Sequence, residues 1–225
     1  MAPAKLLHRL IASAALTGAV ALLVACGGES APLPAGPSPT PALAKDVSCG
    51  PSTSKIASVP RNGQHTFKAL PAPIVDPAKS YTALIKTDKG DITVDLVPKA
   101  APVAVNNFVF LACTGFYDGL IFHRVVKDPT PFVIQSGDPR GDGAGGPGYI
   151  FDDEYSPDLR FDTVGILAMA NAGAGTNGSQ FFITLSPQAS LNDKYSALGK
   201  VTSGQDVAGK INQGDKVVSI SVQEK

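Results

Sequence analysis

An arginine and a histidine stand side by side in the apolar stretch at residues 121–126, as Arg124 and His123. The Ile, Phe and Val residues around them are typical of a β-strand, in which neighbouring side chains point to opposite faces. One of the two polar side chains is therefore expected to reach into a cleft. An arginine held there would bring a permanent positive charge and a planar fork of N–H donors. The chemistry that it offers is hydrogen-bond donation to a bound group.

Other kinds of catalytic site find little support in the sequence. Residues 141–146 match the dinucleotide pattern G-x-G-x-x-G, but Pro147 follows, so no helix begins there to bind a phosphate. The neighbouring stretch half resembles a calcium loop, with Arg140 where a carboxylate is required. The three acids at 152–154 are more typical of a solvated turn than of an acid/base pair, and Ser179 lies outside any nucleophile elbow. A hydrolase or a nucleotide-binding protein is not indicated.

The composition fits one globular domain with extensions. The chain has 225 residues and balances 19 Lys+Arg against 19 Asp+Glu, whereas nucleic-acid binders carry a clustered basic excess. Hydrophobic residues make up 44%, enough for a core, and 23 glycines with 19 prolines favour turns and short strands over long helices.

Residues 1–25 are expected to be a lipoprotein signal peptide. A basic start precedes an apolar stretch at 10–24 that is short for a membrane span. The stretch ends in Leu-Val-Ala-Cys at 23–26, which resembles the lipobox of bacterial lipoproteins and implies lipidation at Cys26. The alternative is an ordinary signal peptide with an incidental cysteine. We expect a protein anchored to a membrane of the bacterial cell envelope, on its extracytoplasmic side.

The next two segments read as a tether and an extension. Residues 26–45 carry five prolines among Ala, Ser and Gly, a composition that favours extended polyproline conformations and cannot bury a core. This tether would hold the globular part off the bilayer; a proline-rich recognition motif is the alternative. Residues 46–80 are expected to be an irregular N-terminal extension, because prolines interrupt any regular element.

Export leaves Cys49 and Cys113 in an oxidising compartment, where two thiols more often pair than stay free. We expect a disulfide between them, with a buried free Cys113 as the alternative. Only His65 and His123 lie beyond the signal segment, and no ligand spacing is recognisable, so no metal site is expected.

Residues 81–225 show the pattern of a β domain. Strands at 81–87 and 91–97 are joined by a hairpin turn at 88–90, and Pro102 suits the first turn of a helix at 101–113 that ends at Gly115. The pattern predicts a second helix at 204–212 and further strands at 121–126, 133–136, 165–169, 181–184, 195–201 and 217–222. We expect a mainly β fold, a closed eight-stranded antiparallel barrel capped by two helices.

Four motifs resemble those of the cyclophilins, the barrel family of peptidyl-prolyl cis-trans isomerases. In chain order they are FYDGLIFHRVV (116–126), PFVIQSGDP (131–139), GDGAGGPGY (141–149) and GILAMANAGAGTNGSQFFITL (165–185). The resemblance covers residues 81–222 and does not extend over 46–80.

The resemblance implies roles for individual residues. Arg124 matches the catalytic arginine, and Gln135 the glutamine that orients it and the substrate backbone. The other matches are the proline pocket (Phe132, Val133, Phe182, Leu191), the substrate-binding segment (Ala170, Asn171, Ala172), a polar contact (Gln180), a neighbouring groove (Gly143, Ala144) and the rim (Tyr195). Without the resemblance, Phe132, Val133 and Phe182 would read as ordinary barrel core. Ser190 stands where the best-known relatives have tryptophan, which implies weak inhibition by cyclosporin.

The resemblance also implies a mechanism, in which Arg124 donates to the imide nitrogen of an X-Pro bond and no cofactor is needed. The partners would be proline-containing segments of exported proteins, bound by a monomer. The alternative is a catalytically weak proline-peptide binding module or holdase.

Overall fold

The computed structural model describes Cys49 and residues 59–225. The expected signal peptide, the tether and the lipidation site at Cys26 lie outside the described residues. In the described part, no helix is long and apolar enough to cross a membrane.

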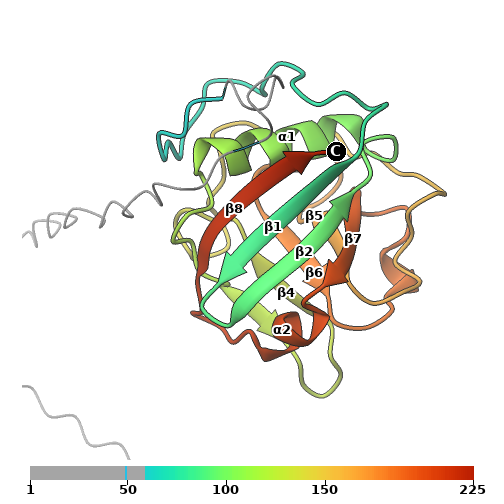
Figure 1. Ribbon diagram of the computed structural model, residues 1–225. Helices are drawn as coiled ribbons and strands as arrows, with labels where there is room; N and C mark the ends of the chain where they lie inside the picture. The colour runs from blue at the N-terminus through green and yellow to red at the C-terminus, as the bar shows by residue number, and fades with distance from the viewer. Residues whose placement is uncertain (1–48, 50–58) are drawn as a thin grey trace, which may run out of the picture. The chain divides into compact units, whose positions relative to one another are not determined.

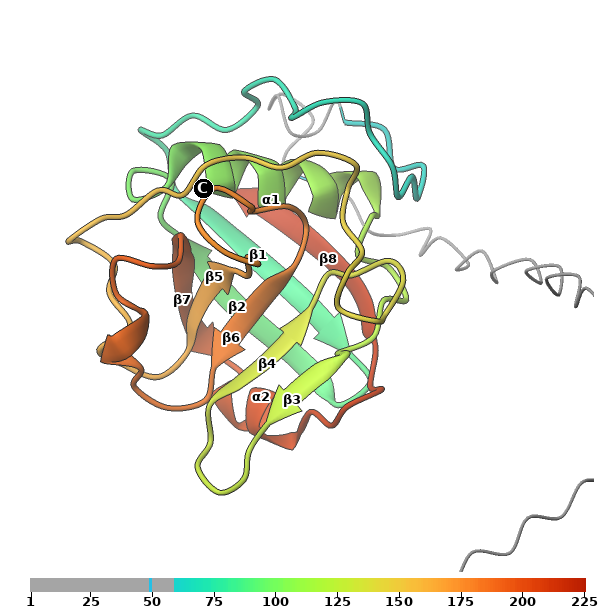
Figure 2. The same cartoon turned by 180° about the vertical axis from the view of Figure 1, so that it is seen from behind.

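Eight strands form one antiparallel sheet with the order β3-β4-β6-β5-β7-β2-β1-β8. Figure 1 shows β8, β1 and β2 in front, and Figure 2 shows β3, β4, β6 and β5 from the opposite side. The strands are β1 (Tyr81–Thr87), β2 (Gly90–Leu96), β3 (Arg124–Val126), β4 (Val133–Ser136), β5 (Ile166–Met169), β6 (Phe181–Thr184), β7 (Ala197–Ser203) and β8 (Val217–Glu224).

The first hairpin follows directly from the local sequence. Tyr81, Ala83 and Ile85 alternate with more exposed residues along β1, so one face of the strand is buried. β1 pairs with β2 in register from Tyr81 opposite Leu96 to Thr87 opposite Gly90. Gly90 has a φ of +127°, a conformation that other residues rarely adopt, so the expected turn is confirmed.

The sheet is curled but open, so the expected closed barrel is not what the described strands form. β3 and β8 are the two edges, and β3 has only three residues, too few to pair along β8. Among the described residues, the two edges meet where the segment before β3 contacts the start of β8 and the residues just before it. There the N–H of Gly119 donates to the carbonyl oxygen of Val217 at 2.7 Å, and that of Phe122 to Asp215 at 2.8 Å.

Two strands begin two or three residues later than the sequence predicted, while the starts of the others agree to within one residue. β3 begins at Arg124 instead of residue 121, so the alternation argument that separated His123 from Arg124 does not apply. β7 begins at Ala197 instead of residue 195, and Tyr195 leaves the ladder to pack edge-on against Phe182, with ring centroids 5.4 Å apart. In both places contacts with distant residues override the local strand preference: backbone bonds of Phe122 to Asp215 and Gly214 before β3, and the Phe182 ring at Tyr195.

The two helices, α1 (Pro102–Thr114) and α2 (Gln205–Lys210), lie at opposite ends of the sheet (Figures 1 and 2). Both expected helices are confirmed, the second in shorter form. α1 has no capping side chain at its own N-terminus. The carboxylate of Glu154 instead accepts the N–H groups of Val103 and Ala104 at 3.1 and 2.8 Å, which satisfies donors that a helix leaves unpaired.

Apolar residues gather on both faces of strands β4, β6 and β5. On one face Ile134, Ile183 and Leu167 join the main core, which also takes the buried side of α1. The opposite face carries a smaller cluster, and it is this cluster that supports the site described below. Its buried members are Val133, Phe161, Ile166, Ala168, Phe182 and Ala197.

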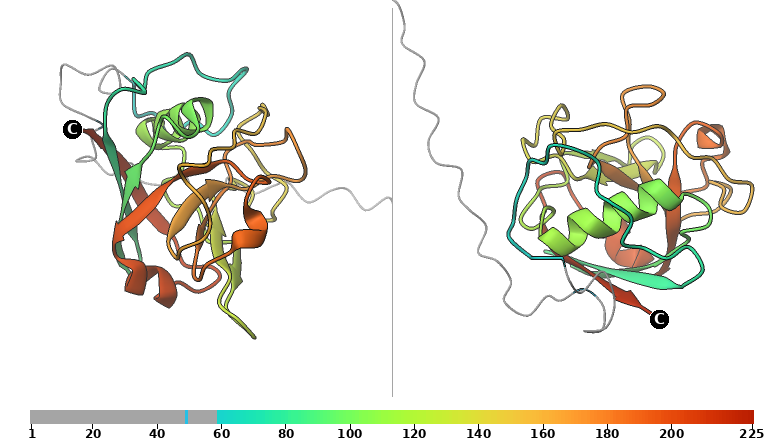
Figure 3. Two further views of the ribbon diagram at one scale, coloured as in Figure 1. Left: turned by 90° about the vertical axis from the view of Figure 1, so that its right-hand side faces the viewer. Right: turned by 90° about the horizontal axis from the view of Figure 1, so that it is seen from above.

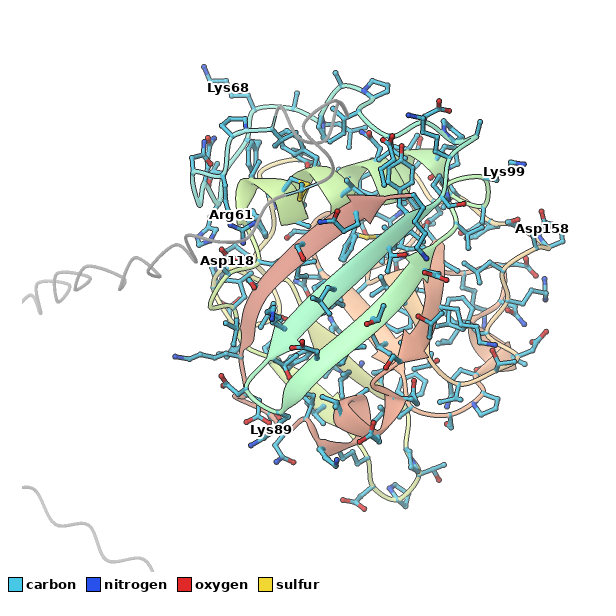
Figure 4. All side chains as sticks on the ribbon, in the orientation of Figure 1. Arg61, Lys68, Lys89, Lys99, Asp118 and Asp158 are labelled. Atoms are coloured by element: carbon cyan, nitrogen blue, oxygen red, sulfur yellow. A yellow bond between two sulfur atoms is a disulfide. The ribbon has the colours of Figure 1, made fainter. Side chains whose placement is uncertain are left out.

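Residues 59–80 contain turns and bends but neither helix nor strand, and they pass along α1 (Figures 1 and 3). Two links hold this part of the chain against the domain. Cys49 and Cys113 form a disulfide with their Cα atoms 5.6 Å apart, and Cys113 lies in the last turn of α1. Arg61 donates from Nη2 to both carboxylate oxygens of the buried Asp118, at 2.6 and 2.5 Å (Figure 4).

Candidate active site

Strand register places four side chains in a row across the smaller apolar face. Arg124 in β3 lies opposite Gln135 in β4, and Gln135 lies opposite Phe182 in β6. Phe182 in turn lies opposite Ala168 in β5. Directly opposite residues of an antiparallel pair project to the same face, so the sheet brings together a cation, an amide and an aromatic ring.

Arg124 is exposed at the edge of the sheet and is held from two sides. Its Nη1 donates to Oε1 of Gln135 at 3.2 Å. Its guanidinium carbon lies 5.7 Å from the centroid of the Phe132 ring, a cation–π distance. These contacts leave the remaining N–H groups of the fork free to meet a ligand.

A second pair of amides fixes the orientation of Gln135. Its Nε2 donates to Oε1 of Gln180 at 2.9 Å. Gln180 in turn donates from Nε2 to the carbonyl oxygens of Gly143 and Gly145, each at 2.9 Å. Because carbonyl oxygens only accept, this chain of bonds determines which end of each amide is the donor, and it presents the oxygen of Gln135 to Arg124.

Beside the arginine lies a hollow of about 280 Å³ that both apolar and polar side chains line. Its floor is the Phe182 ring, which stacks on Phe161 at 5.9 Å and meets Tyr195 edge-on. Val133 and Phe182 are only 2% and 4% exposed, so they belong to the core and to the hollow at once. The lining residues are Arg124, Phe132, Val133, Gln135, Ala170, Asn171, Phe182, Leu191 and Tyr195.

A second hollow of about 470 Å³ adjoins the first and shares Gln135, Ala170 and Asn171 with it. It lies between the glycine-rich loop and the segment after β5. Besides the three shared residues, the predicted site residues that line it are Gly143, Ala144, Ala172 and Gln180. Lining residues that the sequence did not predict include Gly145, Pro147, Tyr149, Ile150 and Thr176. Every residue predicted for catalysis or substrate binding thus lines one of these two hollows.

Ser190 does not line the first hollow. It is exposed on the short 3-10 helix Ala189–Leu191, whose last residue contributes to the wall. The expected weak inhibition by cyclosporin therefore stays a prediction from the resemblance.

Two of the three consecutive acids are not in a solvated turn, so that expectation was wrong. Glu154 caps α1, and Asp153 accepts hydrogen bonds from the side chains of Asn171 and Asn177 at 3.0 and 2.8 Å. The N–H of Gly175 also donates to Asp153, at 2.8 Å. Asp153 thereby positions Asn171, which lines both hollows. No local sequence pattern reveals this role, since the partners lie about 20 residues away.

The glycine-rich loop is also organised by a carboxylate. Asp138 is buried and accepts the backbone N–H groups of Arg140 and Gly143 at 2.7 and 2.6 Å. No helix follows in residues 141–150, in agreement with the rejection of a dinucleotide site. Among Cys49 and residues 59–225 there is no group of three or more potential metal ligands.

His123 is half-buried beside Arg124, and both of its ring nitrogens lack a hydrogen-bond partner within the described residues. Burial lowers the pKa of His123 from its ordinary value, and the neighbouring Arg124 charge acts in the same direction. A neutral imidazole does not compete with the arginine as a cation at the site.

Comparison with known proteins points to one family. The family model "Cyclophilin type peptidyl-prolyl cis-trans isomerase/CLD" matches residues 82–224. Peptidyl-prolyl cis-trans isomerase B of Streptomyces anulatus is 49% identical over 140 residues, which make up 56% of this chain and 78% of that protein. Peptidyl-prolyl cis-trans isomerase cyp15 of Rhizopus delemar is 51% identical over 133 residues, which cover 58% of this chain and 21% of that longer protein.

Solved structures agree. The chain is similar to a cyclophilin type peptidyl-prolyl cis-trans isomerase of Cryptosporidium parvum, with a TM-score of 0.60 and 35% identity over 64% of this chain and 97% of that one. The same isomerase in the presence of the dipeptide Ala-Pro matches with a TM-score of 0.58 and 36% identity, over 62% and 96% of the two chains.

Proposed function

The chain belongs to the cyclophilin-type peptidyl-prolyl cis-trans isomerase family, and from this we propose that it accelerates rotation about X-Pro peptide bonds of the polypeptides that it binds. The observation that carries the proposal is a hollow with an aromatic and aliphatic wall next to an arginine fork that Gln135 holds in place. The structure of a related isomerase was determined in the presence of the dipeptide Ala-Pro, which supports a proline-containing ligand for this chain.

The barrier to this rotation comes from resonance. The lone pair of the imide nitrogen is shared with the carbonyl group, which gives the bond double-bond character and a barrier of about 18–20 kcal/mol. In the twisted transition state the lone pair returns to nitrogen, which then becomes a hydrogen-bond acceptor. A donor aimed at that nitrogen therefore stabilises the transition state more than the planar ground state.

We propose Arg124 as that donor. Arginine offers a planar fork of N–H donors, and Gln135 and Phe132 hold this one beside the hollow. With the proline ring of the substrate seated on the Phe182 ring, the imide nitrogen of that proline would face the guanidinium of Arg124. The rotation breaks no covalent bond, so the residues present suffice, and no nucleophile or cofactor has to enter the mechanism.

The second hollow would hold the residues that precede the proline. Asn171 and Ala170 stand between the two hollows, where their backbone groups can meet an extended peptide. Asp153 keeps Asn171 in place, and the glutamine pair forms the opposite wall. The substrate would therefore be read as an extended segment rather than as an isolated proline.

We also propose that the substrates are exported proteins and that a lipid at Cys26 anchors the isomerase, as a monomer, on the extracytoplasmic side of a bacterial membrane. The support is the lipobox-like sequence at residues 23–26 and the disulfide, a bond that persists in oxidising compartments.

Exchange spectroscopy by NMR on a short Ala-Pro peptide tests the activity. Catalytic amounts of the protein should bring cis-trans interconversion from tens of seconds into the subsecond range. Peptide binding without faster exchange would support the alternative of a proline-binding module or holdase and would refute the enzyme.

A further inference from the structure

A third hollow of about 380 Å³ continues the row formed by the first two. It shares Ile150 with the second hollow, just as the second shares Gln135, Ala170 and Asn171 with the first. The third hollow therefore adjoins the second hollow at Ile150, at the start of α1, on the side away from the residues that the second hollow shares with the first.

Large apolar side chains gather around this third hollow. Leu70, Val103 and Ile150 line it and are 38%, 40% and 67% exposed. They make up half of the six large hydrophobic side chains that are exposed in the described part of the chain. Grouped exposed apolar residues mark binding surfaces, whereas isolated ones need no explanation.

The extension contributes Leu70 and is fastened on both sides of it. Before Leu70, the N–H of Phe67 donates to the carbonyl oxygen of Pro147 at 2.8 Å, which ties the extension to a wall of the second hollow. After it, the N–H of Ile74 donates to Oδ1 of Asn106 in α1 at 2.7 Å. Leu70 lies before the family match, which begins at residue 82, so this wall is an addition to the matched domain.

The other side of the hollow is held by α1 and its carboxylate cap. Val103 stands in the first turn, where Glu154 accepts its N–H at 3.1 Å. Both charged side chains in the lining, Asp152 and Glu154, are acidic. Glu154 is engaged by the helix, while Asp152 is exposed and open to a ligand.

We infer that the third hollow is a subsite for a large apolar side chain of the same polypeptide, several residues upstream of the proline, with a basic neighbour preferred to an acidic one. This inference rests on the proposed function, since the first two hollows must hold the proline and the residues before it. An extended segment that fills them continues past Ile150 into the third. The substrate class is thus an unfolded segment with an apolar residue ahead of its X-Pro bond.

The test compares peptides with one host sequence, an alanine-rich chain that contains a single Ala-Pro. Leucine or phenylalanine is moved upstream one position at a time, and kcat/KM for isomerisation is measured with the full chain. Leucine or phenylalanine at one position, or at two adjacent ones, should raise kcat/KM about tenfold by lowering KM, as expected for partial burial of such a side chain. At that position, a neighbouring lysine should bind better than glutamate.

Variants locate the effect. The double change Leu70→Ala with Val103→Ala should abolish the gain, whereas Val218→Ala, which removes an equally exposed aliphatic residue on β8, should keep it. Should the double variant lose its fold, Asp152→Lys serves instead and should invert the lysine preference. Binding of the same peptides to the slow variant Arg124→Ala, followed by NMR shifts, should show the same positional gain in affinity.

The outcomes separate the two proposals. No faster exchange on the host peptide would overturn the proposed enzyme. Faster exchange on the host peptide with no gain at any upstream position would overturn the subsite alone. A gain that persists in Leu70→Ala with Val103→Ala, or a lysine preference that persists in Asp152→Lys, would also overturn it.

Discussion

Replacement of Arg124 by alanine is the most direct test of the proposed chemistry. The change removes the fork that Gln135 holds by a 3.2 Å hydrogen bond at the mouth of the proline hollow. Gln135 keeps its other bond, to Gln180, so the remaining wall of the hollow should stay in place. Arg124 is exposed on an edge strand, so the free energy of unfolding should change by no more than about 0.5 kcal/mol.

The expected loss of rate follows from the role of a single preorganised donor. Removal of one such donor typically raises the barrier by about 2.7–4 kcal/mol, or 10²–10³-fold in rate. Arg124 is partly open to water, which weakens its field, so we expect the lower end, about 10²-fold. Arg124→Lys should recover little of the lost rate. A lysine ammonium group lacks the planar face that contacts Phe132, and it cannot donate to Gln135 and to the substrate in the fixed directions of a guanidinium fork.

The assay is NMR exchange on a prolyl peptide, with circular dichroism and urea unfolding to show that the fold is intact. Arg160→Ala is a control for loss of a guanidinium, since Arg160 is a partly exposed arginine that pairs with Asp193 at 3.5 Å and does not line the proline hollow. It should retain the wild-type rate. A folded Arg124→Ala protein that isomerises the peptide at a near-wild-type rate would refute donation by this arginine.

The remaining predictions concern stability and location. Arg61→Ala should lower the unfolding free energy by about 3 kcal/mol, because it leaves a buried carboxylate unpaired. Loss of the exposed Lys210–Asp206 pair should leave the unfolding free energy nearly unchanged, and urea titration compares the two variants. Burial lowers the pKa of His65 below its ordinary 6.5, so below neutral pH the unfolded chain binds more protons than the folded one. The contribution of His65 to the unfolding free energy should therefore be complete above about pH 7 and be lost as the pH drops through the folded pKa. A His65→Gln variant that retains the whole pH dependence of the unfolding free energy would contradict this. Cys113→Ser should cost up to about 4 kcal/mol by opening a loop of 64 residues, and two free thiols in the unreduced wild-type protein would exclude the bridge. Cys26→Ser should move the mature protein from the detergent phase to the soluble fraction, and an unlipidated wild-type N-terminus by mass spectrometry would argue against the anchor.

Local patterns were enough to predict the elements that carry the site. Alternating burial in β1, the glycine of its turn and the proline in the first turn of α1 depend on interactions within a few residues, which sequence shows directly. The site residues came from motif resemblance. Once Arg124 and Gln135 lie on paired strands, register alone brings them together, because opposite residues share a face.

Tertiary structure decided what depends on distant partners. Whether the sheet closes is set by the pairing of its edges, and a three-residue β3 is too short to complete it. Glu154 and Asp153 look like solvated acids until the fold brings them to α1 and Asn171. The third hollow combines the extension, a helix and a loop, through Leu70, Val103 and Ile150. Contacts between residues far apart in the chain leave no periodic trace in it, so only the folded packing reveals them.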